Sequence, residues 1–446
     1  MNDTQYQNEA QLDKLQFQTF SYFWHEGNPL NGLVTDKTAP DWPAGTAATG
    51  LALTSYPVAV ERGFVARDLA AERTLATLRF FRKSRHGPEP EATGHHGFYY
   101  RSLDMYKGRR ARISEISFID TSIFLAGALT AALYFNDDTS SETEIRSLAN
   151  ELYLKADWQW ALDGGTTFVD GWKPETGFLK SRSKCYDEAM LMYILSLGSP
   201  SYPIPENSYA EWISTFEWIN SHGYDYLNAG PLLIHQLPHV WIDFRGIQDE
   251  YMGNKGIDYF ENSERATRVQ QLYAIENAGK FEGYGKYFWG LTISDGPCTS
   301  SLKVNGKGFL GHARRGVPYG PDDGTVSPWA AVASLPFAPD IILPLIERLL
   351  NEQDLNIPDS YGFKSSYNPT YTHSPHNPHG WRSPWHYATN QGPAMPLIEN
   401  FRTGFLWEMM KNSKYISEGL RRAGFKGGWL IEKQEHSRVR YHQPVR

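Results

Sequence analysis

Two adjacent carboxylates precede the most apolar segment of the chain. Asp187 and Glu188 stand directly before Ala189–Leu197, which is apolar almost all the way round, so a helix formed there belongs in the interior. Gly198 and Pro200 end this segment, as Gly after the last turn and Pro shortly beyond it commonly do. The start of a helix favours anions because it is the positive end of the helix dipole. A buried helix that begins with two carboxylates indicates acid chemistry at that end.

Carboxylates also stand at the starts of two other apolar segments. Glu115 and Asp120 lie early in Ser114–Phe135, and 322–323, both Asp, precede Ser327. If these starts converge on one rim, that rim is lined by carboxylates and is the first place to look for a site. Aromatic residues make up 14% of the chain, and many lie in loops, where their rings could stack on flat sugar faces. The alternative is that they simply form a large core.

About twelve segments have helical spacing, and apolar segments alternate with amphipathic ones in much of the chain. A two-layer ring requires this alternation, because its inner helices are buried on all sides and its outer helices on one face only. We therefore predict an all-α fold, an (α/α)6 double-layered toroid with a few short strands in its loops. The predicted helical segments are Leu12–Glu26, Thr46–Glu61, Val65–Ser84, Ser114–Phe135, Ser141–Leu162, Ala189–Leu197, Glu206–His222, Leu232–Ile242, Tyr259–Glu276, Ser327–Leu335, Pro339–Asn351 and Pro393–Met410.

The length of 446 residues could accommodate about two or three domains. The chain contains no Gly/Ser run, no block of like charge and no low-complexity tract that would act as a linker. We therefore predict one toroidal domain over residues 1–446. Nothing in the sequence indicates an oligomeric state.

Charge, cysteine content and hydropathy exclude several classes of partner. A net charge of -7 with scattered Lys and Arg argues against nucleic acid and anionic membranes. Two cysteines, Cys185 and Cys298, are too few for a disulfide framework and are spaced unlike a zinc site. No stretch of about twenty apolar residues could span a membrane. Met1–Gln11 lacks the apolar core of a signal peptide, so we expect a cytoplasmic protein, or a periplasmic or secreted one if a leader was removed.

Several sequence blocks, in their order along the chain, carry a family resemblance. Together they span nearly the whole chain from about Phe17 to Trp407, and the chain resembles the glucoamylase-like family that includes bacterial endo-β-1,2-glucanases, glycoside hydrolase family 144. The blocks are Asp120-Thr121, Tyr186-Asp187-Glu188-Ala189-Met190 through Pro200, His239-Val240-Trp241-Ile242-Asp243-Phe244-Arg245-Gly246-Ile247, Tyr259-Phe260-Glu261-Asn262-Ser263, Asp322-Asp323-Gly324-Thr325, Gln391-Gly392-Pro393 and Glu399-Asn400-Phe401-Arg402-Thr403-Gly404.

The resemblance implies an (α/α)6 barrel that hydrolyses β-1,2-linked glucan or gluco-oligosaccharides with inversion and needs no metal or cofactor in the chemistry. An inverting enzyme uses one protonated carboxyl as acid and one carboxylate to activate water. We expect Glu188 to be the acid, because burial would favour retention of its proton. The alternative is that Glu188 caps its own helix or pairs with Lys184. Asp120 is the leading candidate for the base, with a helix N-cap as its structural alternative.

The remaining candidates are groups that could stack on glucose rings or hydrogen-bond to hydroxyls. Each of them has a structural alternative in packing or fold maintenance. Glu399 has Arg402 three residues further on, which favours a buried ion pair over substrate binding. The predicted substrate-binding residues are Trp24, Trp42, Tyr186, Asp187, His235, Asp243, Arg245, Trp381, Trp385, Gln391 and Glu399.

The chain departs from the family pattern at two positions where some relatives are expected to carry an acid. Ser365 and Asn390 occupy these positions. The departure keeps a non-catalytic glycan-binding toroid open as an alternative function. A polysaccharide lyase on the same toroid is a second alternative, although lyases act on uronates and need a basic site, which an acidic rim disfavours.

Overall fold

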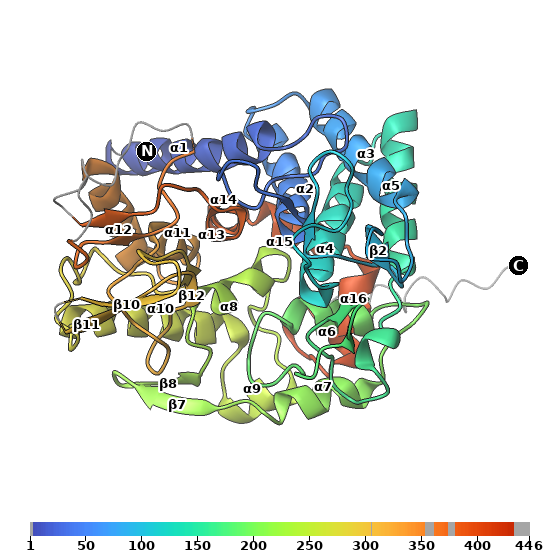
Figure 1. Ribbon diagram of the computed structural model, residues 1–446. Helices are drawn as coiled ribbons and strands as arrows, with labels where there is room; N and C mark the ends of the chain where they lie inside the picture. The colour runs from blue at the N-terminus through green and yellow to red at the C-terminus, as the bar shows by residue number, and fades with distance from the viewer. Residues whose placement is uncertain (1–2, 305, 353–360, 373–379, 432–446) are drawn as a thin grey trace, which may run out of the picture.

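The computed structural model describes residues 3–304, 306–352, 361–372 and 380–431. Six helices that are buried around their whole circumference form its inner ring (Figure 1). Their buried faces are continuous because they contain few polar side chains, as predicted for inner helices. Contacts join α2 to α4, α4 to α6, α8 to α11, α11 to α14 and α14 back to α2. The inner helices are α2 (Thr46–Glu61), α4 (Phe118–Tyr134), α6 (Met190–Leu197), α8 (Leu232–Gln236) continued by the 3-10 turn η2 (Leu237–Val240), α11 (Pro328–Ala333) and α14 (Ala394–Arg402).

Six partly exposed helices form the outer layer, each buried on one face. α1 packs against α2, α12 and α14, and α5 packs against α3 and α4. This arrangement is the predicted all-α, (α/α)6 double-layered toroid. The outer helices are α1 (Asp3–His25), α3 (Arg67–Lys83), α5 (Ser140–Leu154), α7 (Glu206–Ile213), α10 (Tyr259–Glu276) and α12 (Pro339–Asn351).

Short helices complete the described part of the chain. Helix α16 (Lys414–Arg422) packs against α6, and α15 (Phe405–Met410) packs against α14 and α4. The others are α9 (Glu250–Lys255), α13 (Ala388–Gln391) and the 3-10 turn η1 (Trp160–Leu162). None of the helices described here is long and apolar enough to cross a membrane.

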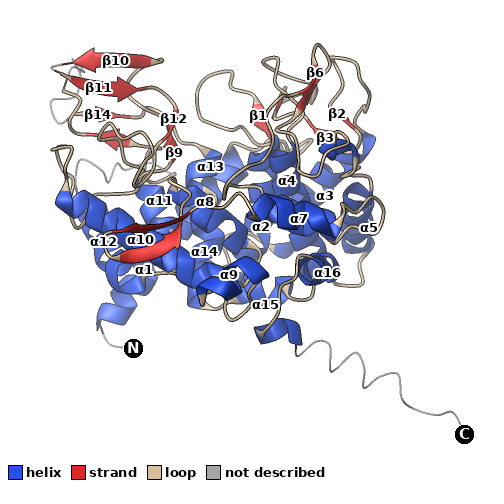
Figure 2. Cartoon of the chain, turned by 90° about the horizontal axis from the view of Figure 1, so that it is seen from below, coloured by secondary structure: helices blue, strands red, loops and turns tan. Residues whose placement is uncertain are grey.

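The strands form two-stranded antiparallel pairs, and Figure 2 shows that most of them lie on one side of the helical layer. The exception is the hairpin of β7 (Trp218–Ser221) and β8 (Tyr224–Leu227), which lies beside α10. The other pairs are β1 (Ala44–Gly45) with β4 (Ser102–Leu103), β2 (Gly94–His95) with β3 (Phe98–Tyr99), β5 (Trp172–Lys173) with β6 (Gly177–Phe178), β9 (Ile293–Ser294) with β12 (Ala313–Arg314), β10 (Ser301–Val304) with β11 (Lys307–Leu310), and β13 (Tyr367–Asn368) with β14 (Trp381–Arg382).

Three predicted helices are wrong in their extent. The segment predicted as Ser141–Leu162 is α-helical only to Leu154, and Trp160–Leu162 forms the separate 3-10 turn η1. The segment predicted as Glu206–His222 is helical only to Ile213, because aromatic and β-branched residues from Trp218 pair in β7 instead. Pro393–Met410 is broken into α14 and α15 by Gly404, whose φ of +71° lies in the left-handed region that favours glycine.

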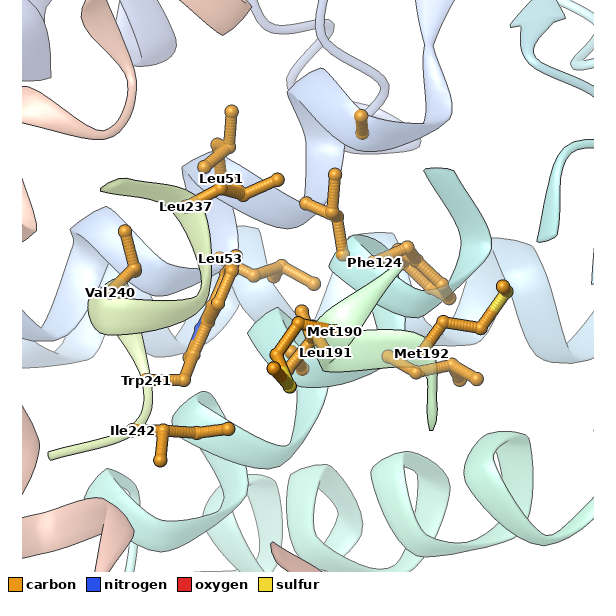
Figure 3. Packing of buried hydrophobic residues seen from close by; sticks show 14 of the residues in the cluster. Leu51, Leu53, Phe124, Met190, Leu191, Met192, Leu237, Val240, Trp241 and Ile242 are labelled. Carbon is orange, nitrogen blue, oxygen red and sulfur yellow. The ribbon is translucent and has the colours of Figure 1, made fainter. Parts of the chain in front are cut away.

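The main apolar core lies between the inner helices. Figure 3 shows part of this core, with Leu51 and Leu53 of α2, Phe124 of α4, Met190, Leu191 and Met192 of α6, and Leu237, Val240, Trp241 and Ile242 from η2 and the residues after it. Trp241 is 1% exposed, and its indole Nε1 donates a hydrogen bond to the Thr54 hydroxyl at 3.1 Å. A tryptophan can be buried so completely because this polar atom has a partner.

The closest approach of two inner helices occurs at two glycines. A Cβ atom placed on Gly127 of α4 would lie 2.1 Å from the carbonyl oxygen of Gly50 in α2. A Cβ on Gly50 would lie 2.5 Å from the carbonyl oxygen of Ile123. Both contacts are to backbone atoms, which cannot rotate away. The crossing of α2 and α4 therefore requires glycine at both positions.

We predict that Gly127→Ala lowers the free energy of unfolding by about 1 to 3 kcal/mol, because the helices must separate to admit the methyl group. Urea unfolding followed by circular dichroism would measure the loss. Gly253→Ala is the matched control, because this glycine lies inside α9 and a Cβ atom placed on it would meet only the Gln248 Oε1 atom, at 3.9 Å. Equal stability of Gly127→Ala and Gly253→Ala would contradict the close-contact interpretation.

Candidate active site

Glu188 lies in the turn before α6 and forms a bidentate ion pair with an arginine from a distant loop. Its Oε1 and Oε2 atoms accept hydrogen bonds from Nη1 and Nη2 of Arg314 at 3.0 and 3.2 Å. The Glu188 side chain is 12% exposed and that of Arg314 is 55% exposed. The carboxylate therefore lies at the edge of the core with its only described ion-pair partner on the solvent side, and Lys184, the alternative partner, does not form this bridge.

Asp187, the other carboxyl of the pair, is hydrogen-bonded within its own turn. Its Oδ1 accepts a hydrogen bond from the backbone N–H of Ala189 at 2.9 Å, and its Oδ2 accepts one from the Ser183 hydroxyl at 3.3 Å. Burial, together with the charge of Glu188, raises the pKa of Asp187 to about 7. Asp187 is therefore largely protonated below pH 7, directly beside the candidate acid in the sequence.

Asp120 lies in the first turn of α4, but it does not cap the helix. The cap is Ser117, whose hydroxyl accepts a hydrogen bond from the Asp120 N–H at 3.1 Å, so the N-cap alternative for the Asp120 carboxylate is wrong. Arg101 places Nε 3.3 Å from Asp120 Oδ2 and Nη2 2.8 Å from Glu115 Oε1. Burial raises the pKa of Asp120, while Arg101 acts in the opposite direction. Asp120 also interacts electrostatically with Glu188, which places the two predicted catalytic carboxyls in one site.

Asp36 is a fourth carboxyl of this site, and no sequence pattern indicated it. It lies in a loop before β1, and burial and the charge of Asp120 raise its pKa to about 6, although Arg101 and Lys37 oppose the shift. Its sequence signal was weak, because Asp36 does not stand at the start of an apolar segment. Only the fold brings this loop beside the start of α4.

Cations and aromatic rings lie next to the carboxyls. The Lys37 ammonium lies 3.7 Å from the centre of the Trp42 ring, and its Nζ donates a hydrogen bond to the Tyr387 hydroxyl at 2.8 Å. Arg112 lies 3.6 Å from the Trp42 ring centre, and Trp385 lies 5.9 Å from Lys37 Nζ. The partly exposed rings of Trp42 and Trp385, both predicted to bind substrate, therefore lie at the same site as Asp36.

The two departures from the family pattern are bonded to each other. The Ser365 hydroxyl donates to Asn390 Oδ1 at 2.7 Å, and Asn390 Nδ2 donates to the Ile293 carbonyl oxygen at 2.8 Å. Gln391 follows in α13, fully buried, and its amide atoms have no hydrogen-bond partner among the described residues. Trp381 is partly exposed in β14. The Ser365–Asn390 pair stands where the family pattern led us to expect an additional acid. Asn390 joins this pair to strand β9 through the Ile293 carbonyl oxygen.

Three predicted substrate-binding residues lie at the other end of the ring. Glu399 accepts hydrogen bonds from Arg62 Nε and Nη2 at 2.6 and 2.7 Å, not from Arg402. Arg62 directly follows α2, whereas Thr46 at the start of α2 contacts residues 100–101 beside the site. The 16 residues of α2 span about 24 Å, so the Arg62–Glu399 pair at the end of α2 lies about that far from the candidate site at its start. Glu399 is therefore a structural ion-pair residue, as the alternative for it proposed.

Asp243 and Arg245 form a second structural cluster at that end. Asp243 pairs with Arg245 at 2.8 Å and with Lys411 at 3.0 Å, and Arg245 lies over the Trp407 ring at 4.3 Å. Lys411 follows α15, whose Met410 and Phe405 contact Thr130 and Tyr134 in the C-terminal part of α4. These residues lie about 15 to 21 Å along the helix from Asp120. The prediction that Asp243 and Arg245 bind substrate is therefore corrected.

Trp24, Tyr186 and His235 are packing residues. Trp24 contacts the Tyr56 ring edge-on at 5.8 Å and lies under the guanidinium of Arg73, between α1, α2 and α3. Tyr186 and His235 are each 2% exposed, and their ring centres lie 5.6 Å apart. Burial lowers the pKa of His235 to about 3, so the imidazole stays neutral. Tyr186, two residues before Glu188, thus packs against His235 and holds the start of this turn in the core. Within the described ranges, no group of three or more His, Cys, Asp or Glu side chains is placed to hold a metal ion.

Comparison with known proteins agrees with this fold. Residues 180–414 match the family described as "Putative glucoamylase". The chain belongs to this family. A structure of a family protein from Bacteroides uniformis, described as a putative glucoamylase, is 28% identical, with a TM-score of 0.83, over 95% of this chain and 98% of its own.

Two further relatives are similar over most of this chain. An exo β-1,2-glucooligosaccharide sophorohydrolase (non-reducing end) from Parabacteroides distasonis is 26% identical over 93% of this chain, which spans 58% of that relative's length. An endo-β-1,2-glucanase from Chitinophaga pinensis, solved with sophorotriose and glucose, has the same fold, with a TM-score of 0.83 over 95% of this chain and 99% of its own, at 23% identity. The toroid is thus shared by the family and by β-1,2-glucan-degrading proteins.

The raised pKa of Asp187 predicts a pH-dependent contribution to stability. The folded protein keeps this proton up to about pH 7, whereas the unfolded chain loses it near the ordinary value of 3.8. The contribution of Asp187 to stability therefore falls as the pH rises from about 4 to 7. In Asp187→Asn this fall is absent, so the free energy of unfolding of the wild type should decline by about 2 to 4 kcal/mol more than that of the variant across this range. Urea unfolding at pH 4, 5.5 and 7 would measure it, and parallel profiles would contradict it.

Proposed function

We propose that this chain is a glycoside hydrolase that cleaves β-1,2-glucan or β-1,2-linked gluco-oligosaccharides with inversion of the anomeric carbon. The observation that carries the proposal is the convergence of Glu188 and Asp120 at the starts of two neighbouring inner helices, in electrostatic contact with each other and with Arg101. Two carboxyls flanking one substrate position are what glycoside cleavage needs. The activities for which the sophorohydrolase and glucanase relatives are named support the linkage.

In the proposed reaction Glu188 acts as the acid and Asp120 as the base. A water oxygen attacks the anomeric carbon while the bond from that carbon to the glycosidic oxygen breaks, and the bonding electron pair stays on the leaving oxygen. Glu188 gives its proton to that oxygen, and Asp120 takes a proton from the attacking water. The burial that raises the pKa of Asp120 makes it a stronger base than an ordinary aspartate. Both carboxyls must exchange protons with solvent before the next turnover.

The binding groups in this proposal are Trp42 and Trp385. Their partly exposed rings lie beside Asp36 and Lys37, where they can stack against the apolar faces of glucose units. Lys37, Tyr387 and Arg112 supply hydrogen-bond donors for hydroxyl groups in the same place. In this proposal the tryptophan rings stack on glucose units, and the hydrogen-bond donors orient the glucose hydroxyl groups.

We predict that Glu188→Gln and Asp120→Asn each lower kcat on a β-1,2-gluco-oligosaccharide by about 100- to 10,000-fold, because each removes one proton transfer. Glu144→Gln is the control, because Glu144 forms an exposed surface pair with Arg79 on α3 and contacts none of the site residues. Retention of wild-type activity by Glu188→Gln would remove Glu188 from the acid role.

A panel of linear β-1,2-, β-1,3- and β-1,4-gluco-oligosaccharides and cyclic β-1,2-glucan, with product sizing, tests the substrate. We expect turnover of the β-1,2-linked members; a ladder of products indicates internal cleavage, and a single short product indicates release from a chain end. A polyuronate added to the panel tests the lyase alternative, because elimination from a uronate gives an unsaturated product that absorbs in the ultraviolet. Binding of β-1,2-glucan without turnover would establish a glycan-binding toroid.

A further inference from the structure

A cavity of about 590 Å³ lies beside the outer helix α3 and is lined mainly by cationic and apolar side chains. Its volume lies in the range of small-molecule sites, about 300 to 1,000 Å³. None of the described residues of the candidate active site lines it. The cationic residues come from α3, the loop that follows α3 and the turn that follows β4, and they are Arg79, Lys83, Arg85, Lys107 and Arg109. These cations gather in one place on a chain whose net charge is -7.

Two of these cations are already neutralised by carboxylates. Arg79 forms a bidentate pair with Glu144, through Nε–Oε1 and Nη2–Oε2 contacts of 2.7 and 2.6 Å. Arg85 pairs with Glu89 at 3.0 Å. These two arginines therefore need no ligand to balance their charges.

The other three, Lys83, Lys107 and Arg109, form no ion pair within the part of the chain that the structure describes. Lys83 lies in the last turn of α3, where the helix dipole favours a cation even without a ligand. Lys107 and Arg109 lie outside any helix, so no helix end accounts for them. Among the described lining residues, Glu91 is the single carboxylate. Even if Glu91 offsets one of the three cations, two remain without an ion-pair partner.

The turn that carries Lys107 and Arg109 is fixed by hydrogen bonds. The Asp104 Oδ1 atom accepts a hydrogen bond from the backbone N–H of Lys107 at 2.6 Å. The Asn31 side chain is 7% exposed and donates a hydrogen bond to the Met105 carbonyl oxygen at 3.0 Å, which joins the turn to a second loop. A backbone that is already ordered loses little further entropy when a ligand binds.

Apolar groups line the same cavity beside the cations. Leu30 is 88% exposed, and the ring of Phe80 is partly exposed. Gly108 packs so closely on this ring that a Cβ atom placed on the glycine would lie 1.9 Å from Phe80 Cζ. A bare ion would leave these apolar surfaces in water, whereas a ligand with an organic part would cover them.

We propose that this cavity binds a small phosphate monoester, with its phosphate group on Lys83, Lys107 and Arg109 and its organic part against Leu30 and Phe80. A phosphate monoester carries a charge of about -1.5 to -2 at neutral pH, which matches the two cations left without a partner. A ligand with a single carboxylate would balance only one of them. Arginine binds phosphate oxygens bidentately and lysine binds them as a point charge. The inference does not depend on the proposed function, because it uses none of the residues given roles there.

Isothermal titration calorimetry of the whole chain tests the proposal with three esters: glucose 6-phosphate, glycerol 3-phosphate and phenyl phosphate. We expect at least one of them to bind more tightly than inorganic phosphate, which has no organic part, and than glucuronate, which has one negative charge. The double variant Lys107→Met, Arg109→Met should weaken that binding by at least about 10-fold, because two charge-assisted contacts are lost. Lys83→Met should weaken it as well, from a separate element.

Lys303→Met is the matched control, because Lys303 is an exposed lysine on β10 that does not line the cavity. It should leave the affinity unchanged. The substituted side chains are exposed, so the variants should keep the wild-type circular dichroism spectrum. Three outcomes would overturn the inference: no binding of any ester, inorganic phosphate that binds as tightly as the esters, or binding that is unchanged in both cavity variants. The last of these would place the ester elsewhere on the molecule.

Discussion

The complete burial of the inner helices is the constraint on which the rest of this structure depends. A helix that is buried on every side has no lateral position for a charged group, so carboxylates can reach solvent only at its ends. Asp120 stands in the first turn of α4, and Asp187 and Glu188 stand in the turn before α6. The contact of Gly50 with Gly127 then brings α2 and α4 together, and with them the chain segments that enter these helices. The acidic site is a consequence of how the apolar ring packs.

The ion pairs of the site and of the scaffold differ in how far the arginine side chain is exposed, with one exception. Arg315 pairs with Asp323 and is 0% exposed, and Arg62 pairs with Glu399 and is 20% exposed. Such pairs hold loops and helix ends together, and the loss of one partner leaves a buried charge. Arg101 and Arg314 are 59% and 55% exposed, although the carboxylates that they bind are mostly buried. Exposure alone does not separate the site from the scaffold, because Arg245 is also 50% exposed beside Asp243, whose side chain is 4% exposed, at the opposite end of the ring.

Periodicity predicted the ring well, because burial imposes a strong pattern. The helices Thr46–Glu61, Tyr259–Glu276 and Pro339–Asn351 have their predicted limits, since each is bounded by residues that end helices or change hydropathy. The error after Ile213 arose because helical spacing cannot reveal strand pairing with Tyr224–Leu227. The break at Gly404 was visible as a glycine, but its left-handed backbone was not.

The site was only partly predictable, because its members come from loops that the fold brings together. Asp187, Glu188 and Asp120 could be identified from their positions beside apolar helices. Asp36, Arg101 and Arg314 could not be identified, since each lies in a short loop or strand whose neighbours are far away in sequence. Family resemblance also suggested Asp243, Arg245 and Glu399, which the fold places at the opposite end of the ring in structural pairs.

The central claim is that two carboxyls at the ends of inner helices hydrolyse a β-1,2-glucosidic bond in a single displacement. Proton NMR of the first turnovers on a β-1,2-gluco-oligosaccharide tests it most directly, because the anomeric signal of the new reducing end records the stereochemistry before mutarotation. The account predicts that the α-anomer forms first. Initial formation of the β-anomer would show retention and a covalent intermediate, and would contradict the roles given to Glu188 and Asp120.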